Sequence, residues 1–199
     1  MHSAAVDHLR SCDPTLASVI DRIGPCRFEP RSQGTHLEAL MRSIIYQQLS
    51  GRAAATIHSR FLSLYGGRSP SAERMLATPD ARLRSVGLSR QKIGYLKDLA
   101  GRVAAKDLPV RRLHELEDDA IIDALVRVKG IGRWTAHMFL MFRLGRPDVL
   151  PELDLGIQKA IRIHWRKRKL PTPQQVTKLG APWAPYRTIA SWYLWRSID

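Results

Sequence analysis

The chain has 199 residues, of which 44% are hydrophobic and 25% charged, which is the composition of a folded globular protein with one domain or two closely associated lobes. It has 32 lysines and arginines against 18 aspartates and glutamates, so its net charge is +14 at pH 7. Such an excess is typical of a protein that binds a polyanion and unusual in an enzyme that acts on a small neutral molecule. A cationic surface without any polyanionic partner is the alternative.

The cysteine content and the apolar runs narrow the protein class further. Cys12 and Cys26 are the only cysteines, too few for a four-cysteine zinc or iron–sulfur site, and they fit a reducing cytosol. The first residues lack the apolar core of a signal peptide, and no apolar run is long enough to cross a bilayer. We therefore expect a cytoplasmic protein, nucleoid-associated if it is bacterial. The sequence also lacks the phosphate-binding-loop and zinc-protease motifs.

The first 50 residues predict three helices. Two short helices precede residue 34, and the second opens at Pro14. The capping box Thr35–Glu38 then opens a third helix whose apolar stripe includes Ile44 and Ile45. Continuing this stripe places Gln48 at the next inward position. Gln48 is therefore either a hydrogen-bonded amide in the core or a side chain that projects into a ligand, and the pattern leaves both readings open.

The rest of the chain predicts further helices separated by glycine and proline. Period-2 alternation is absent, so the expected fold is all-α with about ten short helices. A glycine turn at Gly87 leads to Ser89, the expected cap of a helix that runs to about residue 105, and forms a weak candidate phosphate site. Ser69-Pro70 and Thr78-Pro79 each place a cap residue before a proline at the first helical position, which predicts two short helices. The other expected helices cover 51–66, a segment from about 117, 155–165, a segment capped by Thr172, and one from about 185.

The stretch Leu125–Ala136 reads as helix, tight turn, helix. The turn Gly130-Ile131-Gly132 allows positive φ at either glycine, and the isoleucine is expected to enter the core. The second helix starts at this turn, so its free N–H groups and positive dipole end form a candidate phosphate site. An ordinary αα-hairpin without a ligand is the alternative.

Asp154 is the acidic residue that stands out. It directly precedes the helix 155–165 and lies three residues before Ile157, which favours a role as N-cap. A fixed carboxylate beside a hydrophobic wall could also stabilise a developing cation. Four of the five tryptophans follow residue 150, and the fifth is Trp134. Aromatic walls with one carboxylate suit a flat cationic guest, although core packing also explains most tryptophans.

Together these residues resemble the helix-hairpin-helix DNA glycosylase superfamily, and within it the AlkA-type 3-methyladenine DNA glycosylases. The resemblance spans about residues 35–199. The matching segments are Ile44–Ser50, Gly87-Leu88-Ser89 with Lys92, Gly130–Ala136, Leu150-Pro151 through Asp154-Leu155-Gly156, and Trp183 with Pro185-Tyr186-Arg187 and Trp195.

The resemblance implies a single unit, 1–199, with two helical lobes and the active site in the cleft between them. The lobes would be about 36–128, and 1–35 with 129–199. It also implies a monomer that binds double-stranded DNA, needs no cofactor and uses no catalytic metal. The resemblance also implies that a monovalent cation can bind to the carbonyl oxygens of Lys129 and Ile131.

The resemblance assigns roles to individual residues. Asp154 would be the catalytic carboxylate, and Gln48 would fill the gap left by a flipped nucleotide. The other residues that would contact the DNA are Ser89, Lys129, Gly130, Ile131, Gly132, Arg133 and Thr135. The base pocket would be lined by Trp134, Trp195, Tyr46, Met138, Leu155, Trp192 and His137. Met138 and Leu155 stand where the well-known AlkA has aromatic residues, which implies a wider pocket and weaker cation–π selection.

The implied activity is hydrolysis of the N-glycosidic bond of alkylated bases, of the 3-methyladenine and 7-methylguanine type. Relatives that also cleave the strand use a lysine where Trp134 stands, so no lyase activity is expected. Two alternatives stay open: a non-catalytic DNA-binding module that uses the hairpin alone, and a glycosylase for oxidised or deaminated bases.

Overall fold

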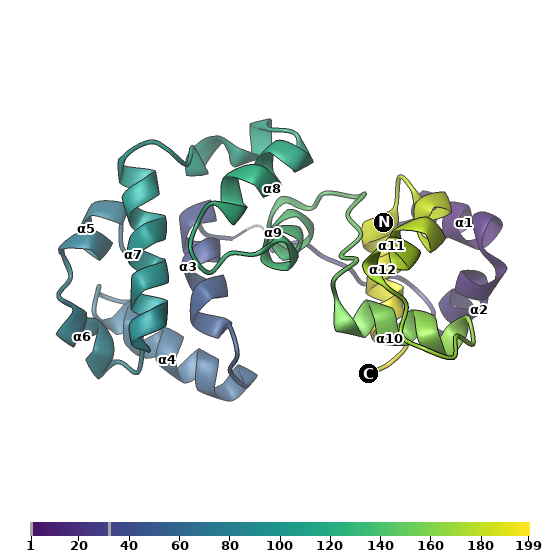
Figure 1. Ribbon diagram of the computed structural model, residues 1–199, viewed down its shortest axis with the longest axis horizontal. Coiled ribbons are helices and arrows are strands. Elements are labelled where there is room, and N and C mark those ends of the chain that lie inside the picture. The colour runs from purple at the N-terminus through teal and green to yellow at the C-terminus, as the bar shows by residue number, and fades with distance from the viewer. Residues whose placement is uncertain (1, 32) are drawn as a thin grey trace. The chain divides into compact units, whose positions relative to one another are not determined.

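The computed structural model describes residues 2–31 and 33–199, and every regular element in these ranges is helical (Figure 1). The all-α prediction is confirmed. The chain divides into two compact units. We call Ser32–Phe139 the internal unit and Met1–Arg31 with Leu140–Asp199 the terminal unit, and each is described by itself.

Most helices of the internal unit pack on α3 or on α7, which has 15 residues. Its elements are α3 (His36–Tyr46), α4 (Gly51–Ser63), α5 (Ala72–Ala77), α6 (Asp80–Ser85), α7 (Arg90–Ala104), the 3-10 helix η1 (Val110–Glu115), α8 (Asp118–Val126) and α9 (Arg133–Phe139). α7 packs against α5 and α3, and α8 packs against α9. Leu96 and Leu99 of α7 and Leu40 and Ile44 of α3 are fully buried, so these apolar stripes form the core of this unit.

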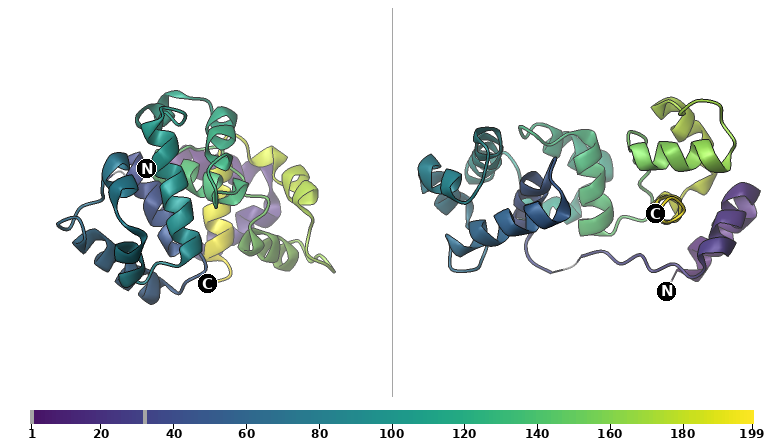
Figure 2. Two further views of the ribbon diagram at one scale, coloured as in Figure 1. Left: turned by 60° about the vertical axis from the view of Figure 1, so that its left-hand side comes forward. Right: turned by 90° about the horizontal axis from the view of Figure 1, so that it is seen from below.

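The terminal unit joins both ends of the chain. Its elements are α1 (Ser3–Cys12), α2 (Pro14–Ile23), the π-helical segment η2 (Leu140–Leu144), α10 (Leu155–His164), α11 (Pro173–Leu179), the 3-10 helix η3 (Ala181–Trp183) and α12 (Arg187–Arg196). α12 packs against α10 and α2, and α1 packs against α2 (Figure 2). Trp183, Tyr193 and Leu194 are fully buried in its core.

Several predicted helix starts are confirmed by their caps. The side chains of Thr35, Ser89 and Thr172 each accept a backbone N–H from the first turn of α3, α7 and α11. The predicted start near Ser69-Pro70 is wrong, because α5 begins two residues later with Ser71 as its cap. The predicted Thr78 cap is also wrong: its buried hydroxyl donates to a carbonyl of α5, and no side chain caps α6.

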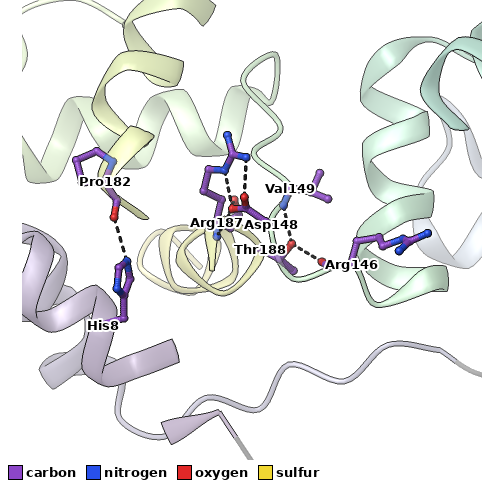
Figure 3. A network of polar contacts seen from close by, with 8 residues as sticks. His8, Arg146, Asp148, Val149, Pro182, Arg187 and Thr188 are labelled. Atoms are coloured by element: carbon purple, nitrogen blue, oxygen red, sulfur yellow. Dashed lines mark hydrogen bonds and ion pairs between the residues drawn. The ribbon is translucent and has the colours of Figure 1, made fainter. Parts of the chain in front are cut away.

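An ion pair fixes the loop that leads to α10. Both carboxylate oxygens of Asp148 accept hydrogen bonds from the Arg187 guanidinium, at 2.6 and 2.8 Å (Figure 3). The Thr188 hydroxyl extends this link by accepting from the Val149 N–H and donating to the Arg146 carbonyl. Burial raises the pKa of Asp148, but the hydrogen bonds and charge of Arg187 outweigh it, so the pKa lies below the ordinary value.

Candidate active site

Asp154 is the N-cap of α10. Its Oδ1 accepts the backbone N–H of Ile157 at 2.9 Å, and it also accepts the Nε1–H of Trp195 at 2.9 Å. Two donors on one oxygen fix the orientation of the carboxylate, and the start of a ten-residue helix favours a negative charge there. The N-cap interpretation is confirmed. The residue is only partly buried.

Aromatic rings line one side of this carboxylate. The Trp195 ring stacks on Phe142, with centroids 5.8 Å apart and an interplanar angle of 26°, and Phe142 packs on Phe28. Leu155, the residue after Asp154, is 52% exposed. Trp192 packs edge-on against its neighbour Tyr193 instead. The terminal unit therefore presents a fixed carboxylate at the edge of an aromatic and apolar surface.

Gly156 gives the indole access to Asp154. A Cβ atom at this position would lie 2.9 Å from Asp154 Oδ1 and 3.1 Å from Trp195 Cδ1. A side chain here would therefore push the carboxylate and the ring apart. A glycine in the first turn of a helix is a sequence signal for such close packing, since it costs about 1 kcal/mol relative to alanine.

In the internal unit, side chains of α7 hold the hairpin between α8 and α9. Gly130 has φ +81°, and a Cβ there would lie 2.2 Å from the Tyr95 ring, so only glycine fits. The Lys129 N–H donates to Asp98 Oδ2 at 2.9 Å. Burial raises the pKa of Asp98, but this hydrogen bond, the hydrogen bond from Arg102 and the charge of Arg102 outweigh it and lower the pKa. These braces were not predicted from the sequence.

The end of α3 forms a further brace. Gln47 donates from Nε2 to the Gly130 carbonyl at 2.8 Å, and Lys92 donates from Nζ to the Ile45 carbonyl at 2.7 Å. The hairpin, α3 and α7 are thus joined through backbone carbonyls. Two adjacent glutamines at a helix end were visible in the sequence, but nothing there identified Gln47 as the one that reaches the hairpin.

The outer part of the hairpin is open. Ile131 is buried, as predicted, whereas Gly132 is exposed and a Cβ there would meet nothing within 4 Å. The Gly132 carbonyl accepts the Ala136 N–H, so helical hydrogen bonding begins at this glycine. The N–H groups of Lys129 and Ile131 are already used inside the protein, by Asp98 and by the Val128 carbonyl.

Gln48 does not continue the apolar stripe of α3. The helix ends at Tyr46, and Gln48 is exposed with φ +56°. The core-amide interpretation is therefore wrong. A left-handed conformation costs a non-glycine residue about 1–2 kcal/mol and persists where the surroundings impose it. The neighbouring Gln47–Gly130 hydrogen bond supplies that constraint.

The other predicted site residues of the internal unit differ in exposure. Trp134, in the first turn of α9, is 43% exposed, and Met138 is half-buried. Thr135 and His137 on the same helix are buried. Tyr46 carries the Arg42 guanidinium 4.0 Å over its ring and packs edge-on against His58, while the Ser89 hydroxyl caps α7. Lys129 and Arg133 are exposed.

Residues 2–31 and 33–199 contain neither a metal-binding side-chain cluster nor a membrane-spanning helix. No cluster of three or more His, Cys, Asp or Glu side chains there is arranged to hold a metal ion. None of the helices formed by these residues is long and apolar enough to span a membrane.

Comparison with known proteins identifies the class. The model of the HhH-GPD superfamily of base excision DNA repair proteins matches residues 41–185, and the chain belongs to this superfamily. It is 38% identical over 193 residues to DNA-3-methyladenine glycosylase 1 of Schizosaccharomyces pombe, covering 96% of this chain and 85% of the relative. It is 29% identical over 198 residues to the alkylbase DNA glycosidase-like protein mag2 of the same yeast, covering 98% and 93%.

Solved structures give the same class. The 3-methyladenine DNA glycosylase Mag1 of Schizosaccharomyces pombe, in complex with abasic DNA, matches with a TM-score of 0.86 and 34% identity over 97% of this chain and 95% of that one. The resemblance inferred from the motifs and the helical glycosylase fold are therefore confirmed.

Proposed function

We propose that the chain is a monofunctional DNA glycosylase that hydrolyses the N-glycosidic bond of alkylated bases in double-stranded DNA and leaves an abasic site for base excision repair. The observation that carries the proposal is Asp154, a partly exposed carboxylate fixed by two N–H donors beside an aromatic surface. The name of one relative supports 3-methyladenine as a lesion, and the abasic DNA bound by the yeast enzyme Mag1 supports DNA as the partner.

The net charge of +14 would supply salt-sensitive affinity for any DNA sequence. The backbone amides from Gly132 into α9 would hold one phosphate, with the Lys129 and Arg133 side chains adding charge. A monovalent cation would use the carbonyl oxygens of Lys129 and Ile131, since the Gly130 carbonyl already accepts from Gln47. Oxygen ligands suit a hard cation, and two carbonyls leave room for DNA oxygens to complete the set.

The damaged nucleotide would be flipped out of the duplex at a cost of a few kcal/mol, which is least for weakly paired bases. Gln48, exposed at the end of α3, would fill the gap. The ring of Trp195, hydrogen-bonded to Asp154, would bind the cationic base by stacking and cation–π attraction. Gln48→Ala is expected to weaken binding to abasic duplex more than to intact duplex. Equal losses on the two duplexes would contradict this role.

In the chemical step the C1′–N bond breaks and its electron pair leaves with the base. An alkylated purine is positively charged, so it leaves as a neutral molecule and needs no general acid. Water adds its hydroxyl to C1′ and releases a proton. Asp154 would stabilise the oxocarbenium-like sugar or orient the attacking water. Trp134 offers no amine to attack the sugar, so the strand is expected to stay intact.

The test is release of free base from a duplex that contains one methylated purine, measured under single-turnover conditions. Wild type is expected to release the base and leave an alkali-labile but uncut strand. Asp154→Asn should bind the duplex equally well and release base much more slowly. Unchanged release by this variant would remove Asp154 from the mechanism, and no release by wild type would favour a non-catalytic DNA-binding module. A panel of oxidised and deaminated lesions in the same assay defines the substrate range.

A further inference from the structure

The terminal unit has a cationic feature at the C-terminal end of α10, the end opposite to Asp154. A groove of about 540 Å³ lies between α2 and the C-terminal end of α10, and Arg22, His164 and Arg166 are among its lining residues. We call it the α2–α10 groove. α10 has ten residues, so at 1.5 Å per residue the groove lies about 15 Å from Asp154.

The two arginines of the groove differ from other arginines of this unit. Arg10, Arg187 and Arg196 each pair with an aspartate. Arg22 and Arg166 form no ion pair with any described residue. No carboxylate lines the groove, so both charges are available to an anion.

The immediate surroundings do not neutralise Arg22. Its Nη2 lies 3.4 Å from His164 Nε2, and burial together with the charge of Arg22 lowers the pKa of His164, so this ring is neutral near pH 7. The nearest acids along α2 are engaged elsewhere. Asp21 pairs with Arg10, and Asp13 accepts from the N–H groups of its own helix and from the Trp183 indole.

The backbone at Arg166 gives independent support. Arg166 has φ +49° at the end of α10, where the Lys167 N–H donates to the Arg162 carbonyl at 2.9 Å and closes the helix. This is the position that glycine normally occupies, because a left-handed backbone strains any residue with a Cβ. An arginine at this position therefore gives up stability that a glycine would provide.

The groove continues into a surface without negative charge. Residues 155–198 contain nine lysines and arginines and no aspartate or glutamate. Lys167, Arg168 and Lys169 follow Arg166 directly and are all exposed. A run of cations that extends beyond the groove suits an extended polyanion better than a single small phosphate compound.

We propose that the α2–α10 groove binds the phosphodiester backbone of a second DNA segment, separate from the duplex that carries the lesion. The guanidinium groups of Arg22 and Arg166 would donate to phosphate oxygens, and the Thr15 hydroxyl and Trp165 indole would form the walls. This goes beyond base removal, since the protein would hold two DNA segments at once.

The test measures binding of a second duplex. The full chain is first saturated with a short unlabelled duplex that contains an abasic-site analogue, and a fluorescent undamaged duplex is then titrated at several salt concentrations. Wild type is expected to bind it. In the double variant Arg22→Gln/Arg166→Gly the slope of log K against log salt should shrink by about 0.9 for each lost phosphate contact, about two units in total. Base release from a short lesion duplex should stay unchanged.

Two controls separate this effect from unfolding and from general charge loss. Arg166→Gly places glycine in the conformation that it prefers, so this variant should melt at a higher temperature while it binds the second duplex less well. Lys178→Gln removes one exposed charge from α11 outside the groove and should change binding little.

Three results would overturn the proposal. The first is a wild type that binds no second duplex, or a double variant that binds it with the wild-type salt slope. The second is slower base release by the double variant, which would place the groove in the lesion-binding surface. The third is displacement of the fluorescent duplex by micromolar pyrophosphate, which would indicate a small-anion site. Because the readout is binding, it stays informative even if wild type releases no base.

Discussion

Two aspartates of the terminal unit have the same local structure. Asp13 caps α2, and its Oδ2 accepts the Nε1–H of Trp183 at 3.0 Å. Asp154 caps α10 and accepts the Nε1–H of Trp195 at 2.9 Å. Each is a helix cap joined to an indole that is distant in the sequence. Local structure alone therefore does not distinguish Asp13 from Asp154, the residue that we propose as the catalytic carboxylate.

The surroundings of the two indoles differ. Trp183 is fully buried, so the Asp13–Trp183 pair closes part of the core. Trp195 is partly exposed, and Leu155 beside Asp154 is 52% exposed. The same carboxylate–indole pair thus contributes stability at α2 and offers an accessible anion with an aromatic wall at α10. Being an N-cap and being catalytic are compatible roles.

The largest expected effect separates the two carboxylates. Asparagine is a good N-cap, so Asp13→Asn and Asp154→Asn should both fold. Asp154→Asn should slow base release by about 10²–10³-fold, the range seen when one group that stabilises transition-state charge is removed. Asp13→Asn should leave the rate unchanged. Single-turnover release by both variants checks this, and a similar loss in both would mean that the effect is structural.

Substitution of the two tryptophans should show the opposite order for stability, with the larger loss at Trp183. Trp183→Phe leaves a void at a fully buried site and removes a hydrogen bond from a partly buried Asp13 oxygen, so it should lower the free energy of unfolding by about 2–3 kcal/mol. Trp195→Phe should cost about 1 kcal/mol, because its site is partly exposed, and should slow base release. Urea unfolding and the release assay measure the two effects. Equal stability losses would contradict the contrast in burial.

Gly156 and Gly101 test the packing around the second pair. Both are helical, but a Cβ at Gly101 in α7 would meet nothing within 4 Å. Gly101→Ala should therefore stabilise the protein by about 0.8–1 kcal/mol. Gly156→Ala should not show this increase in stability, because the added Cβ meets Asp154 and Trp195. It should also slow base release about tenfold, equivalent to about 1.4 kcal/mol in the activation barrier. A Gly156→Ala variant as stable and active as Gly101→Ala would show that the indole has room to move.

The smallest effect concerns the loop ahead of α10 and appears only in acid. The pKa of Asp148 is lower in the folded state than in the unfolded chain, so its contribution to stability is present above about pH 4 and is lost as the pH falls through the folded pKa. Asp148→Asn should be less stable at neutral pH and show a shallower decline in Tm below about pH 4. A parallel decline in variant and wild type would assign the acid sensitivity to other carboxylates.

The features that the sequence predicted correctly are local. The caps Thr35, Ser89, Thr172 and Asp154 were predicted because their partners lie within three residues, and Ile131 because its neighbours are glycines. The prediction that Gln48 continues the apolar stripe was wrong because α3 ends at Tyr46, and no glycine or proline marks this end in the sequence. Thr78 failed because its hydroxyl turns inward to Arg74.

The features that were missed depend on partners far along the chain. Gln47 and Gly130 are 83 residues apart, Asp98 and Lys129 are 31 apart, and the indole that meets Asp154 is 41 residues away. No periodicity or motif spacing reports such pairs. Glycine was the one usable clue, since Gly130 and Gly156 each mark a place where a distant ring comes close.

The division of the chain also sets an order of events on the ribosome. The internal unit is contiguous and ends at Phe139, whereas the terminal unit needs residues 140–199 to cover the first 31. At about 5–20 residues per second, that wait lasts roughly 3–12 s. Leu16, Val19 and Ile20 of α2 stay without α12 during this time. A nascent chain can therefore complete its hairpin before its carboxylate–indole pair, so a chain interrupted there would contain the hairpin and lack the pair to which we assign the chemistry.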